Sequence, residues 1–506
     1  MATPSWSARS VPPSSAGDSA GPARTTHSAS WAVVAHCCGA ILLVTTVVVC
    51  AAEGAASEPS LVARLYLAAT LSLLVGAVLS PRLGALYLVT CFYFAFFVAL
   101  PAVVQIDRRR FPFGSIYTDS ELNAGFLVFA LGQLCLVAAV ATVGRHRRRS
   151  SASAHRAAMT DGAADLKRAA RIGVGIAFVG AVVAALAGPE RIFATRFDET
   201  GSVVMGEGIE TQLIFVARAF ALVGVLLCTA AVKRTPRGLR ANVSGKLIVA
   251  AAVATVVNFP PALPRFQLLG IALAIAVLLI NFQRPITKLI FTFGATLFLL
   301  YLFSTIKDLT NGISLEAIGQ RDVRDYLVTV DFDSYKQVVD TVIYFSSNPL
   351  RWGENFLGAI LFWVPRALWP DKAVHTGELV SSGLGYPFTN VSNPLPAEAF
   401  ASWGIVGTVL IMLVIGAVIG KVEGGGLGAR LTTRPVPAAI TYALAAGYAT
   451  ILLRGALNAV APMIFSAFLL AAVVHLIYRD SRLRDSRARD RNHWVEARRR
   501  TEGQPC

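Results

Sequence analysis

Four side chains that can bind an anion or move a proton lie close together in one stretch of the sequence. Arg366 and Lys372 fall in the segment FWVPRALWPDK (362–372), and His375 and Glu398 follow it. An arginine binds phosphate through two parallel hydrogen bonds, and a lysine adds a point charge. Histidine titrates near neutral pH, and a partly buried glutamate is a second type of base. The pattern indicates a site that holds an anionic group and accepts a proton.

The same segment has a simpler interpretation as a membrane-interface anchor. Trp363 and Trp369 would then lie at headgroup depth, with Arg366 reaching toward water. The apolar run before Pro365 is too short to cross a bilayer, which takes about 20 residues, and Pro365 and Pro370 prevent a continuous helix. We therefore expect a re-entrant or interfacial segment.

The composition shows what kind of protein must position these residues. The chain has 506 residues, of which 55% are hydrophobic and only 15% charged, with a mean hydropathy of +0.59. A soluble domain could not enclose so much apolar surface, so we predict an all-α, polytopic membrane protein. The seven cysteines form no disulfide framework or metal-binding pattern. The net charge of +16 fits anionic lipid headgroups, and we expect no nucleic-acid partner.

Twelve apolar windows have roughly the length of a membrane span. They are 31–51, 61–80, 83–104, 122–144, 170–187, 210–232, 246–259, 266–282, 287–305, 401–420, 436–453 and 459–478. With a cytoplasmic N-terminus, the inner connections carry 19 Lys/Arg and the outer ones 7. The positive-inside rule then places both termini in the cytoplasm of a plasma-membrane protein. Arg108, Arg109 and Arg110 are an exception on the predicted outer side.

The windows divide the chain into five parts. Residues 1–30 form a disordered cytoplasmic tail, 31–305 hold about nine spans, 306–400 form one large extracytoplasmic loop, 401–478 hold three more spans, and 479–506 form a basic cytoplasmic tail. The apolar residues in 333–347 recur with a helical period, which predicts an amphipathic helix. It would lie on the outer membrane surface or cover the ends of the spans.

Further arginines are expected at the same outer surface. Arg218 falls inside a predicted span, where an ionisable group is costly and usually lines a site. Arg265 and Arg454 fall at outer span ends, and Arg191 and Arg196 in an outer loop. Together with Arg366 and Lys372 they would form a cationic basin. A polyprenyl pyrophosphate combines the apolar tail and the anionic head that such a basin suits.

At this point the sequence resembles a known family. The run GAILFWVPRALWPDK (358–372) is similar to the outer-loop signature of the Wzy-type O-antigen polymerases, or oligosaccharide repeat unit polymerases. Gly385-Tyr386, Asn390-Val391-Ser392 and Pro396-Ala397-Glu398-Ala399-Phe400 follow in matching order. The resemblance covers roughly residues 351–420; elsewhere it rests on the predicted topology.

The resemblance implies a polymerase that works without metal or other cofactor at the outer face of the plasma membrane. Its substrates would be oligosaccharides linked to undecaprenyl pyrophosphate, with membrane lipids, a chain-length regulator and a flippase as further partners. Arg366 and Lys372 would contact the pyrophosphate, and Glu398 or His375 would be the base. Arginines can hold the leaving pyrophosphate and neutralise its charge.

Two other classes of function remain open at the level of sequence. One is another polyprenyl-dependent glycosyltransferase or ligase with the same broad chemistry. The other is a flippase or transporter of the lipid-linked glycan, which would also need a cationic cavity. Many transporters are built from paired halves, and no internal repeat is visible here.

Overall fold

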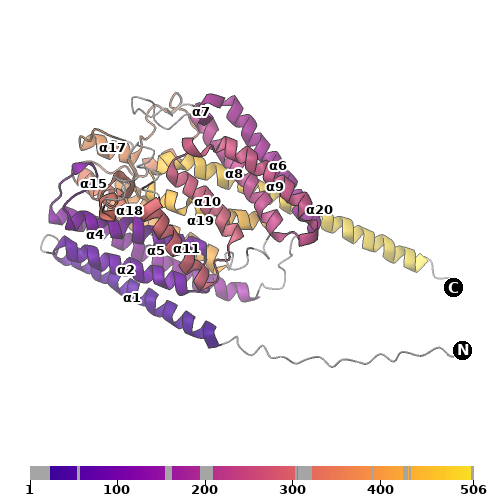
Figure 1. Ribbon diagram of the computed structural model, residues 1–506, viewed down its shortest axis with the longest axis horizontal. Helices are drawn as coiled ribbons and strands as arrows, with labels where there is room; N and C mark the ends of the chain where they lie inside the picture. The colour runs from indigo at the N-terminus through magenta and orange to yellow at the C-terminus, as the bar shows by residue number, and fades with distance from the viewer. Residues whose placement is uncertain are drawn as a thin grey trace.

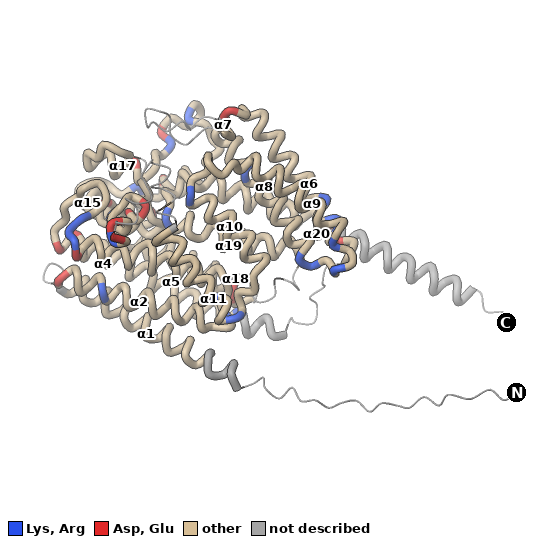
Figure 2. The backbone as a smooth tube through the Cα atoms, in the orientation of Figure 1, with Lys and Arg blue, Asp and Glu red and all other residues tan. Residues whose placement is uncertain are grey.

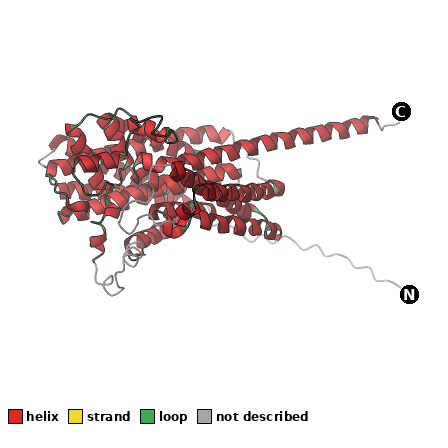
Figure 3. Ribbon diagram, turned by 90° about the horizontal axis from the view of Figure 1, so that it is seen from above, coloured by secondary structure: helices red, strands yellow, loops and turns green. Residues whose placement is uncertain are grey.

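The computed structural model describes residues 23–53, 57–153, 162–193, 209–302, 305, 322–389, 391–425, 431 and 435–502. Every regular element in these ranges is helical, and they contain no strand (Figure 3). This confirms the all-α prediction for the described chain. Arg196 and the first residues of the predicted outer loop, 306–321, lie outside these ranges.

Nine helices within the described ranges are long and apolar enough to cross a membrane. They are α1 (Ala23–Glu53), α2 (Pro59–Leu79), the composite of α3 (Ala85–Tyr93), η1 (Phe94–Ala99) and α4 (Leu100–Asp107), α5 (Asp119–Ser153), α6 (Ala163–Leu186), α8 (Ile209–Arg234), α18 (Leu395–Gly424), α19 (Val436–Arg454) and α20 (Leu457–Glu502). These lengths support a multi-pass membrane protein.

Three further apolar helices are shorter. They are α9 (Ala241–Val257), α10 (Arg265–Leu279) and α11 (Pro285–Leu297), the last continued by η6 (Phe298–Leu302). They fall on the seventh, eighth and ninth predicted windows. At about 1.5 Å of rise per residue, α10 reaches less than a typical bilayer core of about 30 Å. That all twelve helices cross the membrane therefore stays a prediction.

The spans pack closely where small residues face each other. A Cβ atom on Gly270 of α10 would lie 2.8 Å from the carbonyl oxygen of Gly447 on α19. Only a residue without a side chain permits this approach, as in many membrane helix pairs. The contact brings α10 against α19, and both helices also pack against α8. These three helices carry Arg265, Arg454 and Arg218 respectively.

The described part of the predicted outer loop is a folded cap. It contains α14 (Val323–Tyr326), α15 (Ser334–Ser347), α16 (Glu354–Ile360) and α17 (Thr376–Gly383). Helix α15 lies at one end of the bundle beside α17 (Figure 1), and it packs against α5, α18 and α17. The predicted helix exists, and its packing against α5 and α18 agrees with the second expectation, that it covers the ends of the spans. Lys336 and Asp340 on this helix are fully buried, and the ion pair between them offsets the cost of burying the two charges.

Charged residues gather toward the two ends of the bundle, while most of its length carries none (Figure 2). The unexplained cluster Arg108–Arg110 is partly accounted for by acidic partners at the cap end. Arg108 pairs with Asp322 and Asp325, each at 2.6 Å, and Arg109 pairs with Asp119 at 2.8 Å. Arg108 therefore binds the cap to the spans, and Arg109 binds the α4–α5 connection to the start of α5.

The described ends of the chain both lie away from the cap, though apart from each other (Figure 1). The first turns of α1 and the last turns of α20 are both at the end of the bundle opposite α15 and α17 (Figure 1). Within the predicted basic tail 479–506, α20 continues through Glu502. The predicted tail 1–30 overlaps α1, which begins at Ala23.

Candidate functional site

Glu398 is fully engaged by the protein. Its side chain is 1% exposed, and Oε2 accepts hydrogen bonds from Asn355 Nδ2 and Thr376 Oγ1, both at 2.6 Å. Oε1 accepts from the backbone N–H of Leu457 at 2.9 Å, at the start of α20. A carboxylate at a helix N-terminus satisfies unpaired N–H groups and the helix dipole. Glu398 thus joins α16, α17, α18 and α20, which leaves little room for an acceptor hydroxyl.

A break within α18 places Glu398 at this junction. Gly404 has a φ of +61°, a backbone conformation that residues other than glycine rarely adopt. Trp403, directly before it, is also non-helical. The turns before the break accept hydrogen bonds from another segment: Arg351 N–H donates to Ala401 O and Trp352 N–H to Ser402 O. The first turns of α18 can therefore belong to the cap, while the rest of the helix forms a span.

Arg366 and Lys372 fold their own segment into a compact turn. Arg366 Nη1 donates to the carbonyl oxygen of Lys372 at 2.7 Å. Lys372 Nζ donates to the carbonyl oxygens of Phe362 at 2.7 Å and Val364 at 3.1 Å. Both side chains are half-buried, so part of each remains accessible. A structural role explains these bonds without any ligand.

The exposed side chains around this turn support an interfacial position. Trp352 is 75% exposed, Trp363 62% and Leu368 80%. Large apolar side chains outside the spans are suited to the boundary between headgroups and acyl chains. The other face of the turn is anchored by Phe362, whose ring packs edge-on against Phe465 of α20.

His375 is the N-cap residue of α17 and is half-buried. Its Nδ1 atom is buried and has no hydrogen-bond partner among the residues that the structure describes. The next residue, Thr376, donates to Glu398. The imidazole is thus held beside the four-helix junction. Of the two predicted bases, Glu398 is fully bonded to the protein, whereas His375 has a ring nitrogen that no described residue contacts.

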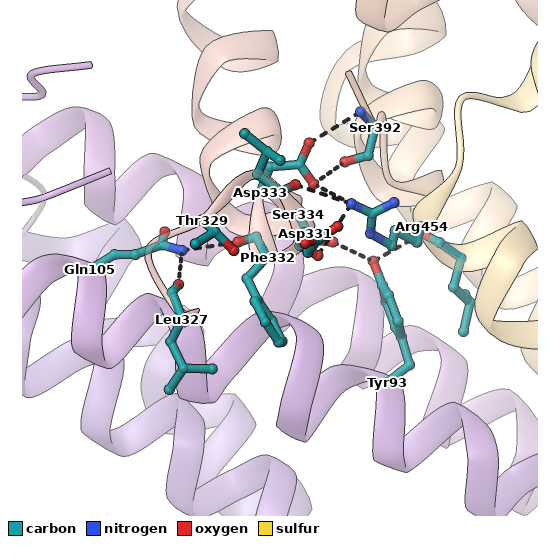
Figure 4. A network of polar contacts seen from close by, with 12 residues as sticks. Tyr93, Gln105, Leu327, Thr329, Asp331, Phe332, Asp333, Ser334, Ser392 and Arg454 are labelled. Carbon is teal, nitrogen blue, oxygen red and sulfur yellow. Dashed lines mark hydrogen bonds and ion pairs between the residues drawn. The ribbon is translucent and has the colours of Figure 1, made fainter. Parts of the chain in front are cut away.

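Arg454, the last residue of α19, is held by the cap (Figure 4). Its Nη2 donates to Asp333 Oδ1 at 3.0 Å and to the carbonyl oxygens of Asp331 at 3.2 Å and Val330 at 3.3 Å. The guanidinium also lies 4.2 Å from the ring centroid of Phe266 on α10. Because Asp333 already neutralises Arg454, this arginine is a weaker pyrophosphate ligand than its sequence position indicates.

Asp333 is in turn fixed from the other side. It accepts hydrogen bonds from the backbone N–H and the hydroxyl of Ser392, and its side chain is 2% exposed. Nearby, Tyr93 donates to the carbonyl oxygen of Leu453, next to Arg454 (Figure 4). The turn from α19 to α20 is therefore clamped between Asp333 and Glu398.

Arg218 is the most unusual of the predicted ligands. The side chain is 1% exposed within α8, and neither Nε nor Nη2 has a hydrogen-bond partner in the described part of the chain. A buried charge without a partner costs several kcal/mol and usually marks a ligand or an ion path. Nothing in the local sequence requires a charge here, since the neighbouring residues are apolar.

The remaining predicted ligands are placed as follows. Arg265 is the first residue of α10, directly before Phe266, so it lies on the same turn as the ring that Arg454 contacts. Arg191 lies in the short helix α7 (Pro189–Phe193), and Arg196 is outside the described residues. The fold thus joins the helices of Arg218, Arg265 and Arg454, while Arg366 and Lys372 occupy a separate turn near α20.

Several important side chains were not predicted from the sequence. Asp333, Asn355 and Thr376 form the bonds that hold Arg454 and Glu398 in place. Their partners are distant in the sequence, so no local pattern reveals them. Lys336 and Asp340 did carry a signal, because their i, i+4 spacing is that of a helical ion pair.

The described residues contain no group of three or more His, Cys, Asp and Glu side chains that could hold a metal ion. No protein-family model matches this chain, and neither does any curated protein or solved structure.

Proposed function

We propose that this protein is a glycosyltransferase that polymerises oligosaccharide repeat units linked to undecaprenyl pyrophosphate, as in the Wzy-type O-antigen polymerases. The observation that carries the proposal is Arg218, a buried guanidinium with two unpartnered nitrogens in a membrane helix. Its helix packs against those of Arg265 and Arg454. An anionic head on an apolar lipid is the ligand that satisfies such a group within a bilayer.

The chemistry uses these residues in separate roles. The acceptor hydroxyl oxygen attacks the anomeric carbon of the donor sugar, and the bond from that carbon to the pyrophosphate oxygen breaks. Arg218 and Arg265 neutralise the leaving pyrophosphate, which stays on the lipid. His375 takes the proton from the acceptor hydroxyl. Arginines supply the charge that a divalent metal supplies in other phosphate sites, so the proposal needs no metal.

Cellular location follows from the same proposal. The cap would face the outside of the plasma membrane, where lipid-linked donor and acceptor are both present, and both termini would be cytoplasmic. The excess of Lys/Arg in the inner connections supports this orientation. The position of the described ends of α1 and α20, both away from the cap, supports it as well (Figure 1).

The test is glycan lengthening by the purified full-length protein. In detergent with EDTA and lipid-linked repeat units, the wild-type protein should produce a ladder of longer glycans on a gel. Arg218→Lys keeps the charge and loses the two-pronged hydrogen bond, so lengthening should fall at least about tenfold. Arg64→Lys is the matched control, because Arg64 is 61% exposed and pairs with Asp107 at the surface.

Each outcome has a definite meaning. Unchanged lengthening by Arg218→Lys would remove Arg218 from the site. A ladder abolished by EDTA would overturn the metal-free mechanism. A folded wild-type protein that moves the lipid across sealed vesicles, and never lengthens the glycan, would be a flippase.

A further inference from the structure

Three aromatic rings form a stack on the cap, apart from the residues discussed above. The Phe113 ring lies 6.0 Å from the Tyr386 ring and 6.2 Å from the Phe388 ring, with interplanar angles of 24° and 26°. Phe113 comes from the connection between α4 and α5, and the other two follow α17. Phe388 is 37% exposed, and Phe113 and Tyr386 are half-buried. We call these three residues the ring platform.

The ring platform is supported from beneath by a buried ion pair. Lys336 Nζ lies 3.8 Å from the Tyr386 ring centroid and 4.9 Å from that of Phe113. The same nitrogen lies 2.5 Å from Asp340 Oδ2, and both side chains are fully buried. The ammonium attracts the ring faces, and the carboxylate cancels its charge. The platform therefore rests on a buried pair of opposite charges.

The platform has a polar edge. The Tyr386 hydroxyl donates to Asp340 Oδ1 at 3.0 Å and lies 3.0 Å from Ser115 Oγ. Tyr117 donates to the same carboxylate oxygen at 2.6 Å. Rings beside hydroxyl groups are suited to a ligand with both apolar C–H faces and hydroxyl groups.

The backbone under the first ring is strained. Phe113 has φ +65°, a conformation that costs about 1–3 kcal/mol for a residue with a side chain. Such strain persists where the surrounding structure fixes it, and it is concentrated at binding sites. This backbone conformation places the Phe113 ring between the rings of Tyr386 and Phe388.

We propose that the ring platform is a subsite for an uncharged sugar of the oligosaccharide repeat unit. The C–H face of the sugar ring packs on Phe388, the exposed ring at the end of the stack, and its hydroxyls bond to Ser115 and Tyr386. A membrane headgroup fits less well, because the lysine below is buried and paired. The subsite is linked to the candidate site through α17: Tyr386 N–H donates to Ser381 O on this helix, which His375 caps. The inference rests on the proposed function for its choice of ligand.

Binding is measured on the full-length protein in detergent. The probe is the lipid-free oligosaccharide released by mild acid from the host's lipid-linked repeat units, and the readout is isothermal titration calorimetry. Phe388→Ala should weaken binding by roughly fivefold or more, because a stacking partner is lost. Phe388→Trp keeps a ring and should retain binding. Ile116→Ala is the control, since Ile116 is 94% exposed in the same connection and lies outside the stack.

The result separates the subsite from the polymerase proposal. Arg218→Lys should bind the lipid-free probe normally, because the probe has no pyrophosphate. If wild-type protein binds the probe but does not lengthen glycans, the subsite stands and the polymerase proposal fails. Equal binding by wild type and Phe388→Ala, with the melting temperature unchanged, would overturn the subsite. If Phe388→Ala loses attachment to anionic lipid vesicles and not to the oligosaccharide, the platform is a membrane contact.

Discussion

At the scale of single residues, the charged side chains differ in whether the protein itself satisfies their hydrogen bonds. Glu398, Arg454 and Lys372 have the charges expected of a catalytic site, yet each makes several hydrogen bonds to the protein. Arg218 and His375 have buried nitrogens without partners in the described ranges. Arg218 is the better indication of a ligand, because it is a charged group at 1% exposure with two unpartnered nitrogens.

One pair of substitutions tests which of Glu398 and His375 is the catalytic base. Glu398→Gln would turn an NH₂ group toward the donors Asn355, Thr376 and Leu457, and should cost about 1–3 kcal/mol of stability. Glycan lengthening per folded molecule should remain. His375→Gln should leave the melting temperature unchanged, since His375 makes no side-chain capping bond, but abolish lengthening. Melting in detergent and the gel assay measure both.

The opposite pattern would reverse the assignment. A Glu398→Gln protein that melts like the wild type and makes no longer glycan would identify Glu398 as the base.

Asp340 predicts a pH dependence of stability. Burial raises the pKa of its carboxyl group above the usual value of 3.8, against the opposing effects of Lys336 and the two tyrosine hydroxyls. The folded state therefore binds the proton more tightly than the unfolded state. The stability from this group is fully present below pH 3.8 and is lost as pH rises through the folded pKa.

The measurement compares unfolding free energies of the wild type and Asp340→Asn across acidic to neutral pH. The advantage of the wild type should be greatest in acid and shrink as pH rises through the folded pKa of Asp340. A difference that grows with pH would show that the Lys336 pair outweighs burial and lowers the pKa.

At the scale of elements, the position of α15 decides how the cap is attached. Its apolar side chains face α5, where a Cβ atom on Gly125 would lie 2.6 Å from Val339 Cγ2. The charged face is buried as well, beneath the ring platform. A helix that is amphipathic in sequence can thus be enclosed on both sides when its charges find partners.

Gly125→Ala tests this packing. The added methyl group collides with Val339 across the α5–α15 contact, so stability should fall by about 1–3 kcal/mol. Gly175→Ala, on α6, is the matched control, because a Cβ there has no neighbour within 4 Å. Alanine also favours a helix over glycine, so that control should be neutral or slightly more stable. Melting of both variants in the same detergent gives the answer; equal melting temperatures would mean that α15 moves away from α5 freely.

At the scale of the whole molecule, the number of helices that cross the membrane sets the side on which each connection lies. Nine helices in the described ranges are long enough, and α9, α10 and α11 are shorter. Local thinning of the bilayer or flanking polar residues can accommodate short spans at modest cost. If all three cross, residues 237 and 382 lie on opposite sides. If none crosses, they lie on the same side.

Cysteine labelling distinguishes the two arrangements. Native Cys37 and Cys38 are exposed and must first be replaced. Ser382→Cys should then react with a membrane-impermeant maleimide on intact cells, and Arg237→Cys only after permeabilisation, because both positions are exposed. If both positions are labelled from the same side, either none of the three short helices crosses and nine spans remain, or two of the three cross.

The sequence alone determined the class of the protein and the approximate location of its helices. The hydropathy of 20-residue windows is a local property, and a bilayer forces each apolar segment to satisfy its backbone internally, so the described helices fall on the predicted windows. The helix at 334–347 was likewise predicted, since helical periodicity is read from neighbouring residues. The charged residues Arg218, Arg366, Lys372 and Glu398 could likewise be identified as candidates from the sequence alone.

Only the tertiary structure decided what these charges do. Asp333 pairs with Arg454 across 121 residues, and Glu398 caps α20 from 59 residues away. Such partners depend on which helices pack together, and close contacts such as that between Gly270 and Gly447 set that arrangement. The ring platform likewise requires two connections that meet over α15. Desolvation and hydrogen-bond satisfaction are properties of the assembled bundle, which is why Arg218 stands out only once its surroundings are known.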